Sequence, residues 1–376
     1  MQSLSILIVA AELNWISTSR MPGALHHAGF EVTVLAPRDA LVTKSRYARR
    51  IGHFPNDCTY PLWVQTLSAA IRAQAPALIV PGDDRSAQLL HRVIDDPPPG
   101  LIPALHARLV ELIQRSLGDP RFYDVAANKF LLADAAIAAG VRVPEQRAVI
   151  GTVAAIEAAR QFGYPSVLKR AHGSGGETVR IAADDSAVAE YTAQAPDAPV
   201  LVQQFIRGKP AAFGAVSLSG AFLGGITAIR LFTDPPQTSP GTVVQLADRP
   251  DVAAAAAKMI EVLGISGFSS FDFLLEEDSG TPFLLECNPR LSVSSYIGTH
   301  FGADLSRDLY RALAGARDAT RPAPTQPVRE QTIALFPQEW LRSPQSAALR
   351  SYVIDAPWDD PELFAATVKS AGIWPA

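Results

Sequence analysis

Residues 271–290 read FDFLLEEDSGTPFLLECNPR, and this stretch decides how the whole chain is interpreted. Two apolar runs flank DSG at 278–280, which fits a three-residue hairpin loop with Gly280 in the left-handed conformation. Both runs nevertheless carry carboxylates, and burying a carboxylate is costly unless something pairs with it. The hairpin therefore implies a partner for its acids.

The expected register of this hairpin brings its polar residues together. If Glu277 pairs with Thr281, then Asp272 lies opposite Glu286. Strand residues two apart share a face, so Asn288 should lie on the same side as Glu286. A register slip of one residue would separate the two carboxylates.

Apolar residues of the hairpin follow the same alternation. Leu274 and Leu284 are expected on the carboxylate face, and Leu285 and Cys287 on the opposite face. Cys287 is accordingly interpreted as a core residue rather than a nucleophile. Its distance in sequence from Cys58 fits no metal or redox spacing.

Asp272, Glu286 and Asn288 present only oxygen ligands. Oxygen ligands suit Mg²⁺ or Mn²⁺, and the absence of His or Cys from that face argues against zinc. Magnesium commonly binds one or two carboxylates together with substrate phosphates, so a nucleotide is the natural companion. Two alternatives stay open: the acids are solvated, or Arg290 pairs with one of them.

A second feature, SVLKRAHGSGGETVRIA at 166–182, supplies the anion-binding side. A β-branched strand delivers Lys169, and a glycine-rich turn follows it directly. Its glycines can present backbone N–H groups to anionic oxygens without obstruction by Cβ atoms. The pattern is neither a Walker loop nor a dinucleotide-binding turn, and alone it is as typical of a plain turn.

The first third of the chain alternates strands and helices. Strands are predicted at 5–11, 31–37 and 77–84, with helices at 17–29 and 62–76. Apolar strands separated by helices predict a parallel sheet covered on both faces.

Two polar segments of this region allow a structural and a functional interpretation. Asp83 and Asp84 follow the third strand and serve either as turn and cap residues or as substrate contacts. The basic cluster KSRYARR at 44–50 fits a solvated turn better than an anion site.

The remainder of the chain has an α+β pattern. Helices are expected at 121–140 and 249–264, a further helix after Asn288, and a hairpin turn at Ser219 and Gly220. The tail after residue 328 is interpreted as a small packed appendage whose core candidates are Trp340 and Trp358.

The predicted fold class combines α/β and α+β units. The expected units are a Rossmann-like domain at 1–120, a small α+β subdomain at 121–207, an antiparallel subdomain with the metal site at 208–315, and a linker plus appendage at 316–376.

The amino-acid composition argues against some classes of partner. The 376 residues have a formal net charge of −4 and no Lys/Arg-rich block, which argues against nucleic acid as the main partner. The early apolar run at 5–11 is too short to span a membrane, so no membrane partner is expected. Two widely separated cysteines favour a reducing, cytoplasmic setting.

Four ordered segments give the chain its resemblance to a known family. It resembles the ATP-grasp superfamily of carboxylate–amine (or thiol) ligases. The segments that carry the resemblance are NK at 128–129, PSVLKRAHGSGG at 165–176, VLVQQFIRG at 200–208 and FDFLLEEDSGTPFLLECNPRLS at 271–292.

The resemblance implies ATP bound between two α+β subdomains, with two Mg²⁺ or Mn²⁺ ions. It implies metal binding by Asp272, Glu286 and Asn288. The residues implied to bind the nucleotide are the phosphate contacts Lys129 and Lys169, the loop Gly173, Ser174, Gly175 and Gly176, and the adenine hinge Gln203, Gln204 and Ile206.

Two positions depart from the family pattern. Many members have glutamate where Gln203 stands, and many have a ribose-binding glutamate where this chain has Pro210. Pro210 offers no polar side chain, so the ribose contact is left unassigned. The acidic end of the site is intact.

The resemblance also implies a reaction, in which a carboxylate takes the γ-phosphoryl group of ATP and an amine then displaces phosphate. Arg290 and Arg230 are the candidate catalytic residues, and the loop at 233–242 is a candidate lid. The alternatives are a phosphotransferase or carboxylase of the same fold, or a catalytically quiet ATP-binding protein. Expected partners are a small carboxylate and an amine, and a homodimer is common among similar proteins.

Overall fold

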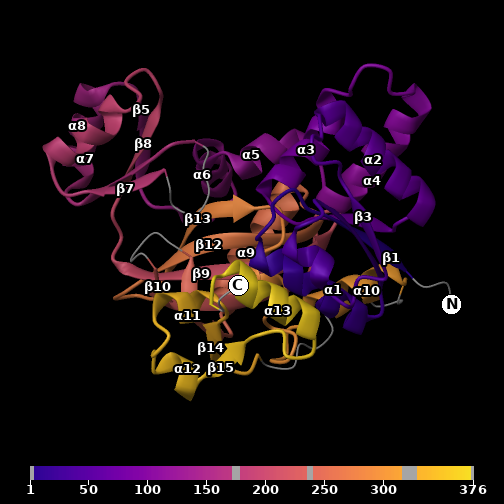
Figure 1. The fold of residues 1–376 in the computed structure, drawn as a ribbon. Coiled ribbons are helices and arrows are strands. Elements are labelled where there is room, and N and C mark those ends of the chain that lie inside the picture. The colour runs from indigo at the N-terminus through magenta and orange to yellow at the C-terminus, as the bar shows by residue number, and fades with distance from the viewer. Residues whose placement is uncertain (1–3, 172–177, 235–239, 316–327, 374–376) are drawn as a thin grey trace.

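A computed structural model of the chain describes residues 4–171, 178–234, 240–315 and 328–373. The described residues form three sheets, one parallel and two largely antiparallel. Figure 1 shows the amino-terminal unit beside the large central sheet, with a small α+β unit projecting from it. Among these residues no helix combines the length and the apolarity needed to cross a membrane.

The amino-terminal unit contains the predicted parallel sheet. Its strand order is β3-β2-β1-β4, and β3 at 50–53 is a strand that the sequence analysis did not predict. Its strands are β1 (Ser5–Val9), β2 (Glu31–Ala36), β3 (Arg50–His53) and β4 (Leu78–Pro81). Its helices are α1 (Ile16–Ala28), η1 (Leu41–Lys44), α2 (Tyr60–Gln74), α3 (Asp84–Asp95) and α4 (Pro103–Leu117).

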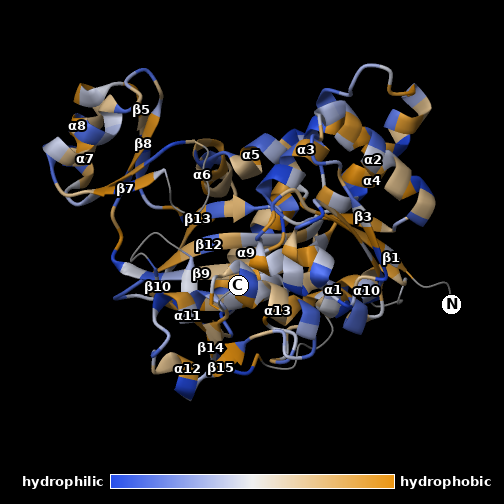
Figure 2. Ribbon diagram, in the orientation of Figure 1, coloured by the Kyte–Doolittle hydropathy of each residue, from blue (hydrophilic) through white to orange (hydrophobic). Residues whose placement is uncertain are grey.

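Strand β1 is buried on both faces, as its unbroken apolar sequence predicts. Ile6 and Ile8 enter one core cluster with residues of α1, while Leu7 and Val9 enter another with residues of α2, α3 and α4. Hydrophobic colouring runs along β1 and its neighbours in Figure 2. The first cluster also includes residues of α10 (Leu305–Leu313), so the amino-terminal sheet packs directly on the carboxyl-terminal half.

The segment predicted as one helix over 121–140 is interrupted. It forms η2 (Pro120–Phe122), α5 (Tyr123–Ala127) and α6 (Lys129–Ala138). Asn128 stands between α5 and α6 in an extended conformation, and its side chain accepts hydrogen bonds from the N–H groups of Phe130 and Leu131. An asparagine that caps a helix in this way competes with helix continuation, and here it fixes Lys129 as the first residue of α6.

The small unit is a four-stranded antiparallel sheet of order β5-β8-β6-β7. Its strands are β5 (Gln146–Val149), β6 (Ser166–Lys169), β7 (Val179–Ala182) and β8 (Val200–Gln204), and its helices are α7 (Thr152–Phe162) and α8 (Asp185–Ala193). Asp184 caps α8, since its carboxylate accepts from the Ala187 N–H. Helix α7 packs an alanine-rich face on the sheet, and α8 packs Val188 and Tyr191 on it.

The large sheet has seven strands in the order β13-β12-β9-β10-β11-β14-β15. The predicted turn at Ser219 and Gly220 is confirmed, because both residues have positive φ angles, of 50° and 80°, as a two-residue type I′ loop requires. The strands are β9 (Gly208–Leu218), β10 (Ala221–Thr233), β11 (Gly241–Ala247), β12 (Gly267–Glu276), β13 (Pro282–Asn288), β14 (Gln331–Leu335) and β15 (Val353–Asp355). The predicted helix at 249–264 is α9 (Pro250–Leu263).

No helix follows Asn288 directly, contrary to prediction. The chain passes through η3 (Val293–Ser295), and α10 begins only at Leu305. The intervening segment packs beneath β9, where the missing side chain of Gly214 leaves room for the backbone of Ser294.

The tail is not a separate appendage. Strand β14 pairs with β11 and β15 with β14, so the tail completes the large sheet. Trp340 and Trp358 are 39% and 66% exposed, and the prediction that they form a core is wrong. The tail instead buries Leu335, Leu363 and other aliphatic residues. Its helices are α11 (Gln338–Arg342), α12 (Ala348–Ser351) and α13 (Pro361–Ser370).

Candidate active site

The hairpin of β12 and β13 sets Asp272 opposite Glu286, as predicted. The residue pairing near its tip, however, differs from the predicted register. Glu276 rather than Glu277 is bonded to Thr281, so the loop has four residues and Gly280 has the predicted positive φ, 70°. This shifts the expected register near the tip by one residue. A β-bulge then shifts it back before the two carboxylates meet.

The extra residue of the bulge is Leu285, which lies between two paired positions of β13. As a result Leu284 pairs with Phe273 and joins the core cluster that contains Cys287, rather than sharing the carboxylate face. Leu285 lines the pocket described below, although the sequence predicted the opposite face for it. The predicted core position of Cys287 is confirmed, and burial raises the pKa of its thiol.

Asn288 completes an array of oxygen ligands. Its Nδ2 atom lies 3.4 Å from Oδ2 of Asp272 and donates to it, so the three predicted metal ligands do lie together. Among the described residues no group of three or more His, Cys, Asp or Glu side chains could hold a metal ion. Any metal held here would therefore have two carboxylates and one amide from these residues, a set that fits magnesium and not zinc.

Cations from two other elements pair with the carboxylates. The Nζ atom of Lys129, at the start of α6, is 3.1 Å from Oε1 of Glu286. Arg230, on β10, forms an ion pair with Asp272. The partner that the buried acids require is thus supplied by the protein itself, and Arg290 does not supply it.

Lys169 ends β6 and is 6% exposed. Burial lowers the pKa of its amino group to about 8, and the neighbouring charge of Lys129 acts in the same direction. The carboxylates of Glu286 and Asp272 oppose this effect without cancelling it. A buried lysine with too little negative charge around it is suited to an anionic ligand.

The pKa of Glu286 is shifted in the opposite direction to that of Lys169. Burial raises the pKa of its carboxyl group, and the charge of Asp272 raises it further. Lys129 and Lys169 oppose the rise. Two carboxylates and two lysines are therefore strongly coupled in one small volume.

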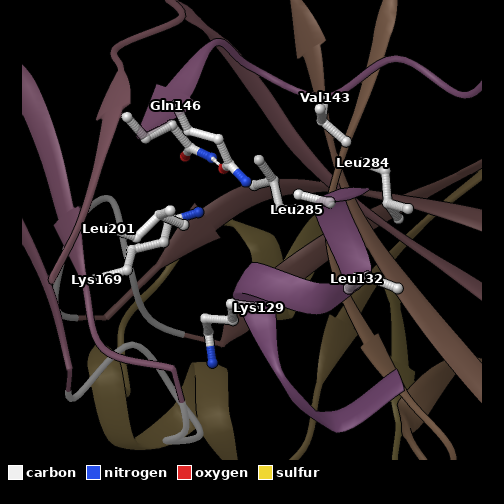
Figure 3. A pocket seen from close by; sticks show the side chains of 10 residues that line it. Lys129, Leu132, Val143, Gln146, Lys169, Leu201, Leu284 and Leu285 are labelled. Atoms are coloured by element: carbon white, nitrogen blue, oxygen red, sulfur yellow. Dashed lines mark hydrogen bonds between the residues drawn. The ribbon is translucent and has the colours of Figure 1, made fainter. Parts of the chain in front are cut away.

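A narrow pocket is lined by the two lysines of this array and by two amides. Gln203 donates from Nε2 to Oε1 of Gln146 over 2.7 Å, and Figure 3 shows Gln146 in the same pocket as Lys129 and Lys169. The remaining walls are apolar and consist of Leu132, Ala133, Val143, Leu201, Leu284 and Leu285. Apolar walls together with amides and lysines are the lining that a flat polar ring attached to an anion would need.

Gln146 was missed by the sequence analysis. Its position follows from the pairing of β5 with β8, in which Gln146 stands directly opposite Gln203. The sequence of a short edge strand does not indicate that one of its amides belongs to a binding site, because this depends on which strand it pairs with. Of the two other hinge residues, Gln204 uses its N–H to bond the Glu145 carbonyl, and Ile206 is almost fully buried.

Arg290 lies at the junction with the amino-terminal unit. Its Nε donates to Oδ1 of Asp84 over 2.6 Å, and Nη2 donates to Oδ1 of Asn288 over 3.3 Å. Its guanidinium carbon stands 5.0 Å from the centre of the Trp15 ring. Asp83 has a structural role, because it caps α3 and accepts from two further backbone N–H groups.

Some predicted residues lie outside the described residues. These are the glycine-loop residues Gly173, Ser174, Gly175 and Gly176, and the central part of the 233–242 loop. Pro210 lies on β9 opposite Leu274, at a strand position with no polar group to offer a ribose.

Part of the chain that forms this site matches a known protein family. Residues 126–294 match the family model of the ATP-grasp domain. The matched region contains the two lysines, the hinge, both strands of the metal-site hairpin and Arg290. The match therefore covers the whole candidate site except the residues contributed by the amino-terminal unit.

Among curated proteins, the chain is 24% identical over 308 residues to the carbamoyl phosphate synthase large chain of Thermotoga petrophila. That alignment covers 77% of this chain and 26% of the relative, so the chain spans about a quarter of the length of the curated relatives it matches.

Two solved structures share the fold at low sequence identity. One is an L-amino acid ligase from Bacillus licheniformis, with a TM-score of 0.61, 15% identity, and coverage of 88% of this chain and 80% of that one. The other is the biotin carboxylase domain of the Hydrogenobacter thermophilus 2-oxoglutarate carboxylase, solved with MgADP and bicarbonate, with a TM-score of 0.63, 17% identity, and coverage of 88% and 74%.

The family match and the shared architecture agree with the arrangement of lysines, amides and oxygen ligands around one pocket. Residues 126–294 of the chain match the ATP-grasp domain, and the fold of the chain is similar to that of the two solved enzymes.

Proposed function

We propose that this protein is an ATP-dependent ligase that joins a small carboxylate to an amine through an acyl phosphate, releasing ADP and phosphate. One observation carries the proposal. Two buried lysines line a pocket together with a pair of amides, and three oxygen ligands lie beside them, one of which pairs with Lys129. Groups suited to a base, to phosphates and to a metal in one neighbourhood support the binding of ATP.

In the proposed complex, Lys129 and Lys169 contact the phosphates of ATP. The amides of Gln146 and Gln203 face the base, which the apolar walls of the pocket hold flat. The glycine loop at 173–176 remains a proposed phosphate contact, as do Gln204 and Ile206 for the base.

Asp272, Glu286 and Asn288 would hold Mg²⁺ or Mn²⁺, in one or two ions, and the donor set fits such ions. When bound, the metal would neutralise phosphate charge. Each carboxylate now has a cationic partner, Arg230 or Lys129. Exchange of these ion pairs for metal and phosphate contacts would leave no buried charge unpaired.

The residues then position the reactants and do little covalent chemistry. The substrate carboxylate attacks the γ-phosphorus, the bond to the β-phosphate oxygen breaks, and ADP leaves. The amine nitrogen next attacks the acyl carbon, phosphate leaves, and the amine loses a proton. Lys169 and Lys129 hold the phosphoryl oxygens during the first step, and Arg290 and Arg230 stabilise the negative charge that develops.

A second candidate uses bicarbonate as the carboxylate, which would make the protein a carboxylase. The names of two relatives favour it, since the carboxylase domain was solved with bicarbonate and the curated relative makes carbamoyl phosphate. The residues proposed here would serve either substrate, because both reactions begin with attack of an oxyanion on the γ-phosphate.

ADP release tests the proposal. The purified protein with MgATP is screened against pairs of amino acids and small carboxylates, and separately against bicarbonate. Hydroxylamine is then substituted for the amine, since it converts an acyl phosphate to a stable hydroxamate.

A hydroxamate formed with ADP from an organic carboxylate supports the ligase. ADP release that depends on bicarbonate alone supports the carboxylase. A phosphorylated substrate without hydroxamate identifies a phosphotransferase and contradicts both, as does the absence of ADP with every substrate. Lys258→Met serves as the control variant, because Lys258 lies on the exposed face of α9 and, among the described residues, pairs with Glu261.

A further inference from the structure

Arg20 is a buried cation that the proposed chemistry does not use. It lies in the second turn of α1 and is 8% exposed. Its Nη2 atom donates to two backbone carbonyls of the tail, those of Phe336 over 3.2 Å and of Asp355 over 3.1 Å. Arg20 thus connects the amino-terminal unit with the last strands of the large sheet.

The rest of the Arg20 guanidinium group has no hydrogen-bond partner. Both Nε and Nη1 are buried without an acceptor in hydrogen-bond geometry, and Arg20 forms no ion pair with a carboxylate of the described residues. Burial raises the pKa of the nearby Tyr296 hydroxyl, and Arg20 acts in the opposite direction. A buried donor left without an acceptor costs about 1–3 kcal/mol, and more when the group is charged. Such an arrangement is explained when an anionic ligand supplies the missing acceptors.

Two polar side chains stand beside Arg20. Tyr296, just after η3, donates from its hydroxyl to Oδ2 of Asp355 over 2.8 Å. Burial raises the pKa of Asp355, and the positive charge of Arg20 acts in the opposite direction. Tyr296 and Asp355 are half-buried residues, and burial raises the pKa of both side chains.

The junction shares two segments with the surroundings of Arg290. Trp15 precedes α1, and its ring centre is 5.0 Å from the guanidinium carbon of Arg290. Arg20 lies five residues after Trp15, on α1, and Tyr296 lies six residues after Arg290. Arg20 and Tyr296 are thus carried by the two segments that border Arg290.

We propose that Arg20 binds a carboxylate group of the small-molecule substrate, at the junction of α1, the segment after η3 and strand β15. The unpartnered Nε and Nη1 groups donate to this carboxylate. Calling the ligand a substrate rests on the proposed function, whereas the binding of a carboxylate at Arg20 does not. Arg20 is then a specificity residue contributed from outside the ATP-grasp domain.

The alternative is that Arg20 only ties the tail to α1. Two substitutions separate these roles because they change carboxylate binding in opposite directions. Arg20→Met removes the donors and should weaken binding. Asp355→Asn keeps the acceptor for Tyr296 but removes the negative charge nearest Arg20, so it should strengthen binding. Arg307→Met is the matched control, since Arg307 donates to the His27 carbonyl of α1 from the exposed surface of α10.

The measurement uses the full chain without nucleotide. Acetate, succinate and alanine are titrated into each variant, and binding is followed by calorimetry and by the midpoint of thermal unfolding. We expect at least one probe to bind the wild-type protein, with affinity reduced about tenfold or more in Arg20→Met and increased in Asp355→Asn. Arg307→Met should match the wild type.

Equal affinity of the wild type and Arg20→Met, or no binding of any probe to the wild type, overturns the proposal. Weaker binding in both Arg20→Met and Asp355→Asn assigns Arg20 a purely structural role and also overturns it. Because no ATP is present, failure of the ADP-release assay leaves this test unaffected, and the two proposals fail separately.

Discussion

Replacement of Lys169 by methionine should make the nucleotide-free protein more stable. Burial lowers the pKa of Lys169 from its ordinary value of 10.5 to about 8. That difference corresponds to a free-energy cost of about 3 kcal/mol for keeping the buried lysine charged, at ~1.36 kcal/mol per pKa unit. Methionine has a similar length and no charge, so Lys169→Met should raise the free energy of unfolding by up to this amount at pH 7.

The gain should depend on pH in a defined direction. Between about pH 8 and pH 10.5 the unfolded chain holds a proton on Lys169 that the folded chain has lost, so wild-type stability rises with pH across this window. The advantage of Lys169→Met is therefore largest below pH 8 and disappears above pH 10.5.

The same substitution should weaken nucleotide binding. A hydrogen bond from a charged donor contributes about 1.5–3 kcal/mol, which corresponds to an affinity loss of about 10- to 150-fold for MgATP. Stability in the absence of nucleotide and affinity for nucleotide thus change in opposite directions, as expected where a binding site is held in an unfavourable state.

Urea unfolding at pH 7 and pH 10.5 measures the first effect, and calorimetry with MgATP measures the second. Lys258→Met is the control, because Lys258 is half exposed and should change neither quantity appreciably. A loss of stability in Lys169→Met at pH 7 would refute the desolvation argument. Unchanged MgATP affinity would refute the phosphate contact.

Three further substitutions test other parts of the site. Glu286→Gln should stay folded, since the raised pKa of this carboxyl group shows that burial favours its neutral form, yet metal-dependent ADP release should fall by about 100-fold or more; full activity would contradict the metal assignment. Gln203→Leu should weaken ATP binding about tenfold and reduce discrimination against GTP in calorimetry, because its hydrogen bond to Gln146 is lost; unchanged discrimination would remove the amides from base recognition. Gly214→Ala should lower the free energy of unfolding by about 1–3 kcal/mol in urea titrations, since a Cβ there would lie 2.6 Å from the Ser294 carbonyl oxygen, and an unchanged midpoint would show that this segment yields easily.

Much of the architecture could be predicted from local sequence patterns. The unbroken apolar runs of β1, β2 and β4 predicted a parallel sheet covered on both faces, and that sheet is present. The turn at Ser219 and Gly220 was predicted from its composition because few residue pairs adopt two positive φ angles. Such signals depend on interactions within a few residues, so they can be read without the tertiary structure.

Errors occurred where a local pattern was extended over a longer range. One helix was predicted over 121–140, but the side chain of Asn128 stops α5 and starts α6. Trp340 and Trp358 were predicted as core residues because large aromatic residues often are, yet the tail buries smaller side chains and completes an existing sheet.

The sequence by itself determined the composition of the site. It placed acids, an amide and a glycine loop on the segments that match an ATP-grasp domain, and periodicity brought Asp272 opposite Glu286. Even this pairing needs a four-residue loop and a compensating bulge at Leu285, neither of which the alternation of residues predicts. The predicted pairing of the two carboxylates is nevertheless correct. The longer loop shifts the register by one residue, and the bulge shifts it back by one.

Only the tertiary structure decided what the charged groups face. Ion pairs between Lys129 and Glu286 and between Arg230 and Asp272 join residues from separate elements, as does the pair of amides that includes Gln146. Arg20 meets the tail across more than 300 positions of sequence. These contacts depend on how packed units meet in space, and charge acts through distance in space rather than along the chain.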